Sequence, residues 1–470
     1  MLILSATIIM TIMLISQKSI LNLKLNTIRL NFVALASLIA IINFNKYNND
    51  IMLLNEWFSS IVLGYDNLTL ILLLLTALLV IFCLLISWSN VKFLEKEFIL
   101  LLIISLIILI VIFSIFDFIV FYVFFEALLI PIFLIINIWG SRKEKFNASY
   151  YLFFFTLFGS LVMLICIINI YSQANLLSVL FLNYISLNYQ SWLFLGISLS
   201  FIIKIPMVPF HIWLPQAHVE APIAGSILLA GILLKLEIYG FIRFAILLLS
   251  NINQGIMAAL IVLSILSIIF GSFLTMRQID IKRLIAYSSV AHMGFCSLAI
   301  FSLNLYGWLA SIILMLSHGF VSSGLFMSAT ILYDRFHSRI IRYYKGILIS
   351  MPIFSSIVML FLLANVAFPG SLNLWGELLT FKSCLQSKFS VFSCLMIVLS
   401  MLISAIYSFN IINKVFFGVV SPLLKFIRDI NKREFYSLII VLSLPWVSGF
   451  YPCWLMNYSK YFIYYNFILN

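Results

Sequence analysis

Apolar runs of 18 residues or more recur along almost the whole of this 470-residue chain. A run of that length is enough for a helix to cross a hydrocarbon core about 30 Å thick. Only 9% of the residues are charged, whereas a soluble domain has about 25%. We find no stretch that is both long enough and polar enough to form a soluble domain. The sequence therefore predicts an all-α polytopic membrane protein.

Polar breaks divide the apolar residues into about fourteen expected spans. The run at 348–380 is too long for one straight span, which predicts an interruption within it. The approximate cores are 1–16, 30–44, 67–89, 98–116, 118–139, 149–172, 191–209, 221–243, 256–276, 284–302, 306–332, 348–380, 389–413 and 436–457.

Lysine and arginine are distributed unevenly between the two sides that this count predicts. Alternate loops on one side carry 20 of the 27 basic residues, and the other side carries five. A wrong count would mix the two sets, so the bias favours fourteen spans with both termini away from the positive side. The topology also explains the net charge of +12 without a nucleic-acid partner. The basic loops are 17–29, 90–97, 140–148, 277–283, 333–347 and 414–435. A loop at 210–220, which contains no lysine or arginine, is expected on the same side.

Several other classes of protein find no support in the sequence. The six cysteines stand singly without a CxxC pair, so iron–sulfur clusters and zinc have no ligand spacing. Neither a Walker loop nor GxGxxG is present to bind a nucleotide. Residues 1–20 have no basic group before their apolar run and no Arg-rich amphipathic pattern. They predict a first membrane helix rather than a secretory signal or a transit peptide.

Four ionisable residues lie within the expected spans: Glu126, Lys204, Lys235 and Glu377. Glu237 follows on the Lys235 helix. Each charge near the bilayer centre costs roughly 2.5–3.5 kcal/mol. Replacing a buried ion pair by apolar residues is often neutral or stabilising, so structural pairing is the weaker explanation for keeping them. We interpret the four as parts of an ion or proton path.

Histidines also fall within or beside the spans. His292 and His318 lie mid-span, and a row of titratable groups gives them a relay role. Haem ligation is the alternative, but paired ligands at regular spacing are missing. Further relay candidates are His211, His218 and Glu220.

The segment FIIKIPMVPFHIWLPQAHVEAP, residues 201–222, predicts a broken helix. Pro206 and Pro209 donate no backbone hydrogen bond, which should leave the carbonyls of Ile202 and Ile205 unpaired. Irregular backbone at membrane depth is tolerated only against protein or beside a watery cavity. The break therefore marks a hydrated position within the membrane.

A second break is predicted where Pro369 and Gly370 interrupt the long run before Glu377. Two Gly/Pro-broken spans in corresponding places indicate an inverted-repeat transporter. Because the breaks are five spans apart, we expect two inverted five-helix repeats, spans 4–8 and 9–13. The expected units are 1–97 with three N-terminal helices, 98–250 and 251–415 with one repeat each, and 416–470 with a C-terminal helix and tail.

Several segments resemble the antiporter-like subunits of respiratory complex I. They are FYVFFEALLIPIFLIINIWG, IKIPMVPFHIWLPQAHVEAPIAGSILLAGILLKLEIYG, DIKRLIAYSSVAHMGF, SHGFVSSGLFM and AFPGSLNLWGEL. The resemblance is dense and covers roughly residues 65–420, and the segment PFHIWLPQAHVEAP is highly specific for this superfamily. The first 60 and last 50 residues resemble the family only in hydropathy.

This resemblance implies a proton-translocating subunit in the membrane arm, located in the mitochondrial inner membrane. The family's pumping residues correspond to Glu126, Lys204, Lys235 and Glu377, and its bridging histidines to His292 and His318. The chain itself would bind no cofactor or metal. NADH, FMN, iron–sulfur clusters and ubiquinone would belong to partner subunits, and the chain would contact membrane lipids, other membrane-arm subunits and sister antiporter-like subunits.

The expected mechanism follows from desolvation, because removal from water favours the neutral forms of lysine and glutamate and lets both exchange protons near neutral pH. Lys204 would hold its proton while Glu126 is close and pass it toward Lys235 when the pair separates. His318 would carry it onward, and Glu377 would release it. Two alternatives stay open: a subunit of a multi-subunit cation/proton antiporter, and a structural or assembly subunit.

Overall fold

The computed structural model describes residues 24, 27, 28, 52–54, 63–88, 90–175, 178, 189–245, 254–387, 390–420, 428–457 and 459. The expected spans at 1–16 and 30–44 and both termini lie outside these residues.

Nine helical stretches within the described ranges are long and apolar enough to cross a membrane, which confirms the multi-pass all-α class. Four precede residue 189: α3 (Asn67–Ser87), α4 (Glu95–Ser114), the continuous pair α5 (Phe118–Ala127) and α6 (Leu129–Trp139), and α7 (Lys145–Ala174). The next runs from α11 (Ile223–Leu228) through the π-turn η2 (Leu229–Leu233) and α12 (Leu234–Gly240) to the π-turn η3 (Phe241–Ala245). The others are α13 (Gln254–Arg277), α14 (Ile281–Phe301), α15 (Leu305–Phe336), and α19 (Ser390–Ile411) with η6 (Ile412–Phe416).

Shorter elements complete the described fold. Two three-residue strands, β1 (Met52–Leu54) and β2 (Leu63–Tyr65), pair antiparallel and are a small addition to the all-α expectation. Directly after β2, Asp66 begins α3 with a capping box, in which the Asp66 N–H donates to Thr69 Oγ1 at 2.8 Å. The remaining short helices are η5 (Ile341–Tyr343) and α16 (Ile347–Ser350).

The first predicted break is present, but it has a helix on each side. α9 (Gln190–Lys204) is followed by η1 (Phe210–Ile212) and α10 (Trp213–Glu220). The expectation of a loop at 210–220 is therefore wrong. α10 packs against α7 and α14, and that packing buries the segment despite its prolines and charged residues.

The second predicted break divides the long run at 348–380. α17 (Pro352–Asn365) begins with a proline at its first position, where the missing N–H has no cost. α18 (Leu372–Gln386) begins after Gly370, whose φ of 96° suits glycine. Between them the Asn373 Nδ2 donates to the Ala364 carbonyl at 2.8 Å and closes one end of α17.

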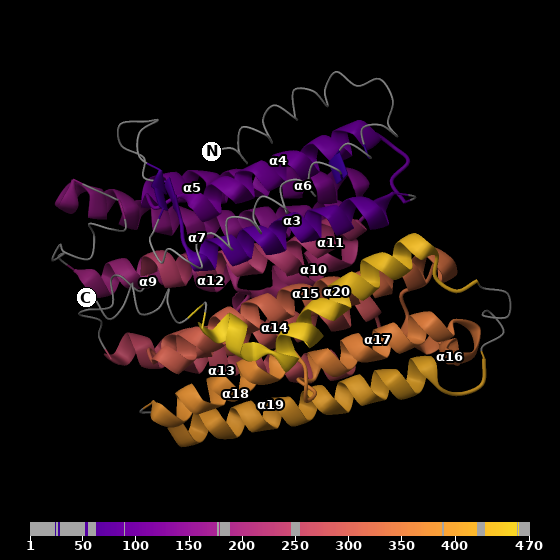
Figure 1. Ribbon diagram of the computed structural model, residues 1–470. Coiled ribbons are helices and arrows are strands. Elements are labelled where there is room, and N and C mark those ends of the chain that lie inside the picture. The colour runs from indigo at the N-terminus through magenta and orange to yellow at the C-terminus, as the bar shows by residue number, and fades with distance from the viewer. Residues whose placement is uncertain are drawn as a thin grey trace.

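The helices run in similar directions and form one continuous bundle (Figure 1). α3 to α7 lie on one side, α13 and α17 to α19 lie on the other, and α10 to α12, α14 and α15 lie between them. α14 packs on both α13 and α15, and α15 packs on α18. The central helices are thus enclosed by protein, and α15 is buried over nearly all of its length.

The basic loops gather at one end of the bundle, which we call the positive face. A cavity of about 430 Å³ there is lined by Lys92, Ser141, Lys282 and Arg339, from the ends of different helices. A second cavity, of about 490 Å³, is lined by residues that include Arg277, Arg342, Lys345 and Lys414. Among the described residues, basic side chains from loops that are far apart in the sequence therefore lie close together in space, and the full alternation stays a prediction.

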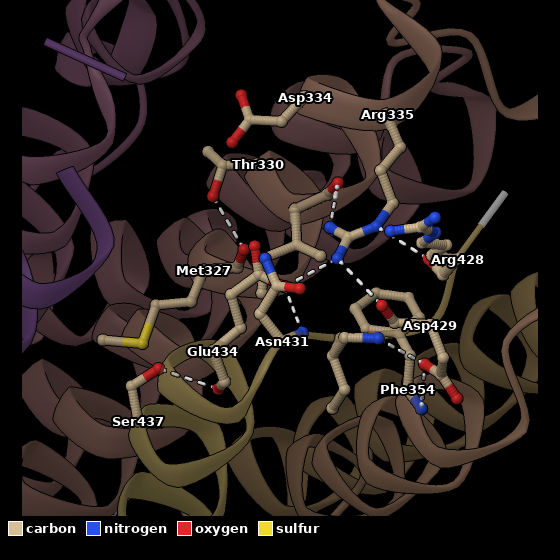
Figure 2. A network of polar contacts seen from close by, with 12 residues as sticks. Met327, Thr330, Asp334, Arg335, Phe354, Arg428, Asp429, Asn431, Glu434 and Ser437 are labelled. Carbon is tan, nitrogen blue, oxygen red and sulfur yellow. Dashed lines mark hydrogen bonds and ion pairs between the residues drawn. The ribbon is translucent and has the colours of Figure 1, made fainter. Parts of the chain in front are cut away.

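α20 (Lys432–Phe450) spans the second break and is attached at both ends. At the positive face the Arg335 Nη2 of α15 pairs with the Glu434 Oε2 of α20 at 2.6 Å (Figure 2). Just before α20, Asp429 accepts from the Ile353 N–H in the first turn of α17. At the other end the Trp375 Nε1 of α18 donates to the Gly449 carbonyl at 2.9 Å. α20 therefore fixes the start of α17 relative to α18.

Candidate functional site

Glu126 and Lys204 form a partly buried ion pair between α5 and α9. The Lys204 Nζ lies 3.0 Å from the Glu126 Oε1. The lysine side chain is 1% exposed and lies over the Phe125 ring, 3.2 Å from its centroid, whereas Glu126 keeps 21% exposure. The lysine is thus enclosed, and its acidic partner is the member of the pair that is accessible from outside the described bundle.

The break after Lys204 is closed by hydrogen bonds. The Met207 N–H donates to the Ile202 carbonyl at 3.2 Å, so the expectation that this carbonyl is unpaired is wrong. The Trp213 indole donates to the Ile203 carbonyl at 2.9 Å. Lys204 is the last residue of α9, and the negative end of the helix dipole at that position favours a cation.

Lys235 lies at the centre of the bundle, directly after the π-turn η2. Its Nζ donates to the Ala230 carbonyl and lies 2.9 Å from the His318 Nδ1 of α15. A protonated lysine can donate to this nitrogen, and a protonated imidazole can donate back to a neutral lysine. The contact can therefore carry a proton in either direction.

Two glycines allow this contact. A side-chain carbon at Gly319 would lie 3.3 Å from the Gly231 carbonyl oxygen and 3.5 Å from the Lys235 Cε. Because neither glycine carries a side chain, η2 and α15 approach closely beside the lysine. The π-turn and the close approach together place Lys235 against His318, and π-turns are frequent at functional sites.

The row continues from His318 to Glu377. The His292 and His318 rings are 5.5 Å apart, and the His292 Nδ1 lies 3.7 Å from the Glu377 Oε1 of α18. All three side chains are buried. The structure thus brings Lys235, His318, His292 and Glu377 into one line, with His292 between the other histidine and the acid.

Glu237 connects this row to the Glu126–Lys204 pair. Its carboxylate interacts electrostatically with both Lys204 and Lys235. Both of its oxygens are buried, and neither has a hydrogen-bond partner within the described part of the chain. Glu237 is not among the relay residues expected from the sequence, although an acid two positions after an intramembrane lysine is a signal of its own.

Asn365 and Tyr407 border the end of the row and are absent from the sequence candidates. The Asn365 side chain lies beside His292, and its Nδ2 donates to the Tyr407 hydroxyl at 3.0 Å. Asn365 is the last residue of α17, at the second break. Uncharged polar residues in a helix carry little sequence signal, and only the proximity to Pro369 could have indicated Asn365.

The three further candidates fall in different places. His218 stacks on Phe326 of α15 at 4.6 Å and interacts electrostatically with Lys235 and Lys282. Glu220 lies 3.6 Å from the Arg339 guanidinium near the positive face. His211 contacts the Tyr287 ring at 6.2 Å and is not brought to the row.

Metal-ligating residues do not cluster in the part of the chain that is described. No three His, Cys, Asp or Glu side chains there are arranged to hold an ion. The nitrogen and oxygen atoms of the row can donate and accept protons.

The fold and the row together define a polytopic membrane subunit with titratable groups at membrane depth. The chain belongs to the NADH:quinone oxidoreductase/Mrp antiporter transmembrane family, which matches residues 115–404.

Curated relatives carry one name over most of the chain. The present chain is 43% identical over 409 residues to NADH-ubiquinone oxidoreductase chain 4 of Metridium senile, and the match covers 87% of this chain and 83% of that one. It is 42% identical over 398 residues to the protein of the same name from Chondrus crispus, covering 84% and 80%.

Solved structures show the same fold. A chain of respiratory complex I from Thermus thermophilus matches with a TM-score of 0.87 at 25% identity, covering 98% of both chains. A chain of the Mrp complex from Dietzia matches with a TM-score of 0.85 at 16% identity, covering 98% and 96%, and shares the fold alone.

Proposed function

We propose that this chain is a proton-translocating subunit in the membrane arm of respiratory complex I. Other subunits would oxidise NADH and reduce ubiquinone, and this chain would perform no redox chemistry. The observation that carries the proposal is the buried row from Lys235 through His318 and His292 to Glu377. The similarity to NADH-ubiquinone oxidoreductase chain 4 proteins supports the same function.

Each group has a proposed role in the transfer. Glu126 controls the charge of Lys204, and Lys204 passes a proton toward Lys235 when the pair separates. Glu237 lowers the barrier between the two lysines, because it interacts with both. The histidines carry the proton to Glu377, with Asn365 holding His292. His218, Glu220 and the more distant His211 are proposed contributors from the positive face.

The finer topology belongs to the same proposal. We propose fourteen spans, with inverted repeats at 98–250 and 251–415 between the units 1–97 and 416–470. The positive face would point to the mitochondrial matrix, and both termini would lie on the intermembrane-space side. FMN, iron–sulfur clusters, NADH and ubiquinone would be held by partner subunits, and sister antiporter-like subunits and lipids would contact this chain.

A subunit of a cation/proton antiporter is the second candidate, because the Mrp complex has the same fold. The 42–43% identity to chain 4 proteins, against 16% to the Mrp chain, favours complex I. Proton flux that depends on sodium would support the antiporter instead.

The test of the relay is substitution at Glu377 in the assembled complex. Glu377→Gln should abolish pumping through this subunit, because an amide neither accepts nor releases the proton. Glu377→Asp should retain part of it. Protons per NADH are measured in sealed vesicles, with the complex content as the control. A Gln variant with the wild-type proton yield would remove Glu377 from the path.

A further inference from the structure

A cluster of buried aromatic rings lies beside the first half of the row. Phe121 is 4.5 Å from Phe244 and 6.5 Å from Phe201, measured between ring centroids. Phe118 stacks on Phe244 at 4.7 Å, and Phe201 lies 5.1 Å from Phe241. These five phenylalanines, which we call the aromatic cluster, come from α5, α9 and η3, and none is more than 2% exposed.

The aromatic cluster touches the ion pair through one ring. Phe125, under the Lys204 ammonium, is 5.2 Å from Phe121 and 6.0 Å from Phe201. The aromatic cluster therefore lies directly next to the Glu126–Lys204 pair, with Phe125 between them.

Chain direction places the whole cluster on one side of the charges. α5 continues through α6 to the positive face at Ser141, so Phe118 and Phe121 lie farther from that face than Glu126 does. Phe121 precedes Glu126 by five residues, which is roughly 7 Å along a helix at 1.5 Å per residue.

The other two helices place their rings on the same side. The helix of Lys235 begins beside Ala221, whose carbonyl accepts from Lys282 at the positive face, and runs away from it to Phe241 and Phe244. α9 reaches Lys204 from the opposite end of the bundle, so Phe201 precedes the lysine on the side away from the positive face. All the rings thus lie between the charged groups and the face opposite the positive one, which we call the far face.

A buried ion pair borders the cluster on the far side. The Arg243 Nη2 lies 2.5 Å from the Asp66 Oδ2, and the two side chains are 2% and 5% exposed. The guanidinium also lies 4.3 Å from the Phe116 ring centroid. Arg243 lies between an acid and an aromatic ring. The border of the cluster on the far side is therefore polar, but its charged side chains are buried.

The second half of the row has a different route to the far face. Beyond Glu377 on α18, Thr380 and Ser383 are buried polar residues, and the Asn304 amide donates to the Ser383 carbonyl at 3.1 Å. A buried water needs two to four polar partners, and these groups can supply them. Phenyl rings cannot supply such hydrogen-bond partners, and apolar constrictions exclude water.

We propose that the aromatic cluster is a water-excluding seal that closes Lys204 and Lys235 off from the far face. Protons taken up in the first half can then leave only through Glu377, and protons from the far face cannot return through the lysines. The inference rests on the proposed relay, because a seal has this consequence only where protons occupy the lysines.

The test compares substitutions at equally buried phenylalanines in the assembled complex. Phe121→Ser introduces space and a hydroxyl into the seal, whereas Phe121→Leu keeps it apolar. Phe354→Ser is the matched control, because Phe354 is 0% exposed and lies at the positive face beside Asp429. Protons per NADH and the rate of NADH oxidation are measured in sealed vesicles. The decay of an imposed pH gradient is measured with and without NADH.

Phe121→Ser should lose part of the proton yield per NADH while NADH oxidation is retained, and the pH gradient should decay faster. Phe121→Leu should keep the wild-type proton yield per NADH and the wild-type decay of the pH gradient, and Phe354→Ser should leave both unchanged. A lesion in the relay itself would instead reduce pumping without a faster decay, so the two failures are distinguishable.

Equal decay rates for Phe121→Ser, Phe354→Ser and the wild type, in turnover and at rest, would overturn the seal. A leak as large in Phe121→Leu as in Phe121→Ser would also overturn it, because loss of packing rather than entry of water would then be the cause. If Phe121→Ser does not assemble, Phe244→Ser against Phe244→Leu is judged by the same outcomes.

Discussion

Two buried lysines are stabilised in different ways in this chain. Lys204 has a carboxylate partner at 3.0 Å and an aromatic ring beneath it. Lys235 has a backbone carbonyl and an imidazole instead. Lys204 therefore has a carboxylate in direct contact, whereas Lys235 is contacted by a carbonyl dipole and an imidazole, and Glu237 interacts electrostatically with both lysines.

Removing the acid from the first pair should disturb the input of the relay. Glu126→Gln preserves the shape of the side chain but no longer compensates Lys204, so pumping and the coupled NADH oxidation should fall severalfold. Assembly should persist, because Glu126 is partly exposed and the lysine keeps its ring contact. The check is protons and NADH turnover per assembled complex, and a wild-type proton yield would contradict the assignment.

Glu237 should matter for the transfer between the lysines. Glu237→Gln leaves the volume unchanged and removes the charge that interacts with both Lys204 and Lys235. We expect slower pumping with the Glu126–Lys204 pair still formed. Glu144→Gln, at a charged loop on the positive face, serves as the control for loss of one acidic charge. Equal turnover of the two variants would show that Glu237 has no part in the transfer.

Charged candidates could be found from the sequence because a charge in an apolar run is rare. Glu126, Lys204, Lys235 and Glu377 stood out for that reason. The distances between these groups could not be read from the sequence, since the contact between Lys235 and His318 joins residues 83 positions apart and is set by the packing of the helices. Tyr407 is one of 21 tyrosines, and only the fold distinguishes it.

At the scale of elements, breaks were predictable and their packing was not. Prolines and Gly370 indicated both interruptions. α10 was mistaken for a loop because its polar residues suggested exposure. Its burial depends on α7 and α14, which supply partners that local sequence cannot reveal.

The contact between α20 and the second break should be sensitive to volume. A side-chain carbon at Gly449 would collide with the Gly370 carbonyl and the backbone of Ser371. Gly449→Val should therefore destabilise the fold by about 1–3 kcal/mol, the usual cost of overpacking. It should also lower the proton yield, because α18 carries Glu377.

The melting temperature and the protons per NADH of the assembled complex check this prediction. Val447→Ala changes a 61%-exposed neighbour and is the control. An unchanged melting temperature in Gly449→Val would mean that α20 adjusts without moving the break.

At the scale of the whole molecule, the basic loops predict the orientation of the chain in the membrane. Their gathering at one face follows from the sequence alternation and is visible in the two cavities there. The number of spans stays a prediction, because residues 1–23 and most of 29–62 lie outside the described ranges. The two inverted repeats also stay a prediction, since helix lengths alone do not establish an internal symmetry.

Orientation can be tested directly. With the positive face toward the matrix, a tag after residue 470 should be cleaved by protease from the intermembrane-space side of intact inner membranes. A tag in the 140–148 loop should be protected there and cleaved from the matrix side. The reverse pattern for both tags would invert the proposed topology.

The attachment of α20 at both ends of the α17–α18 unit also has a consequence for biosynthesis. Synthesis proceeds at roughly 5–20 residues per second, so α18, which ends at Gln386, leaves the ribosome seconds before α20, which begins at Lys432. During that interval the Ile353 N–H and the Trp375 indole lack their acceptors, because Asp429 and Gly449 have not yet been made. The interrupted helix must therefore wait in the bilayer for a later helix to complete its fold, and a translational stop before Lys432 would leave Glu377 inserted but without this support.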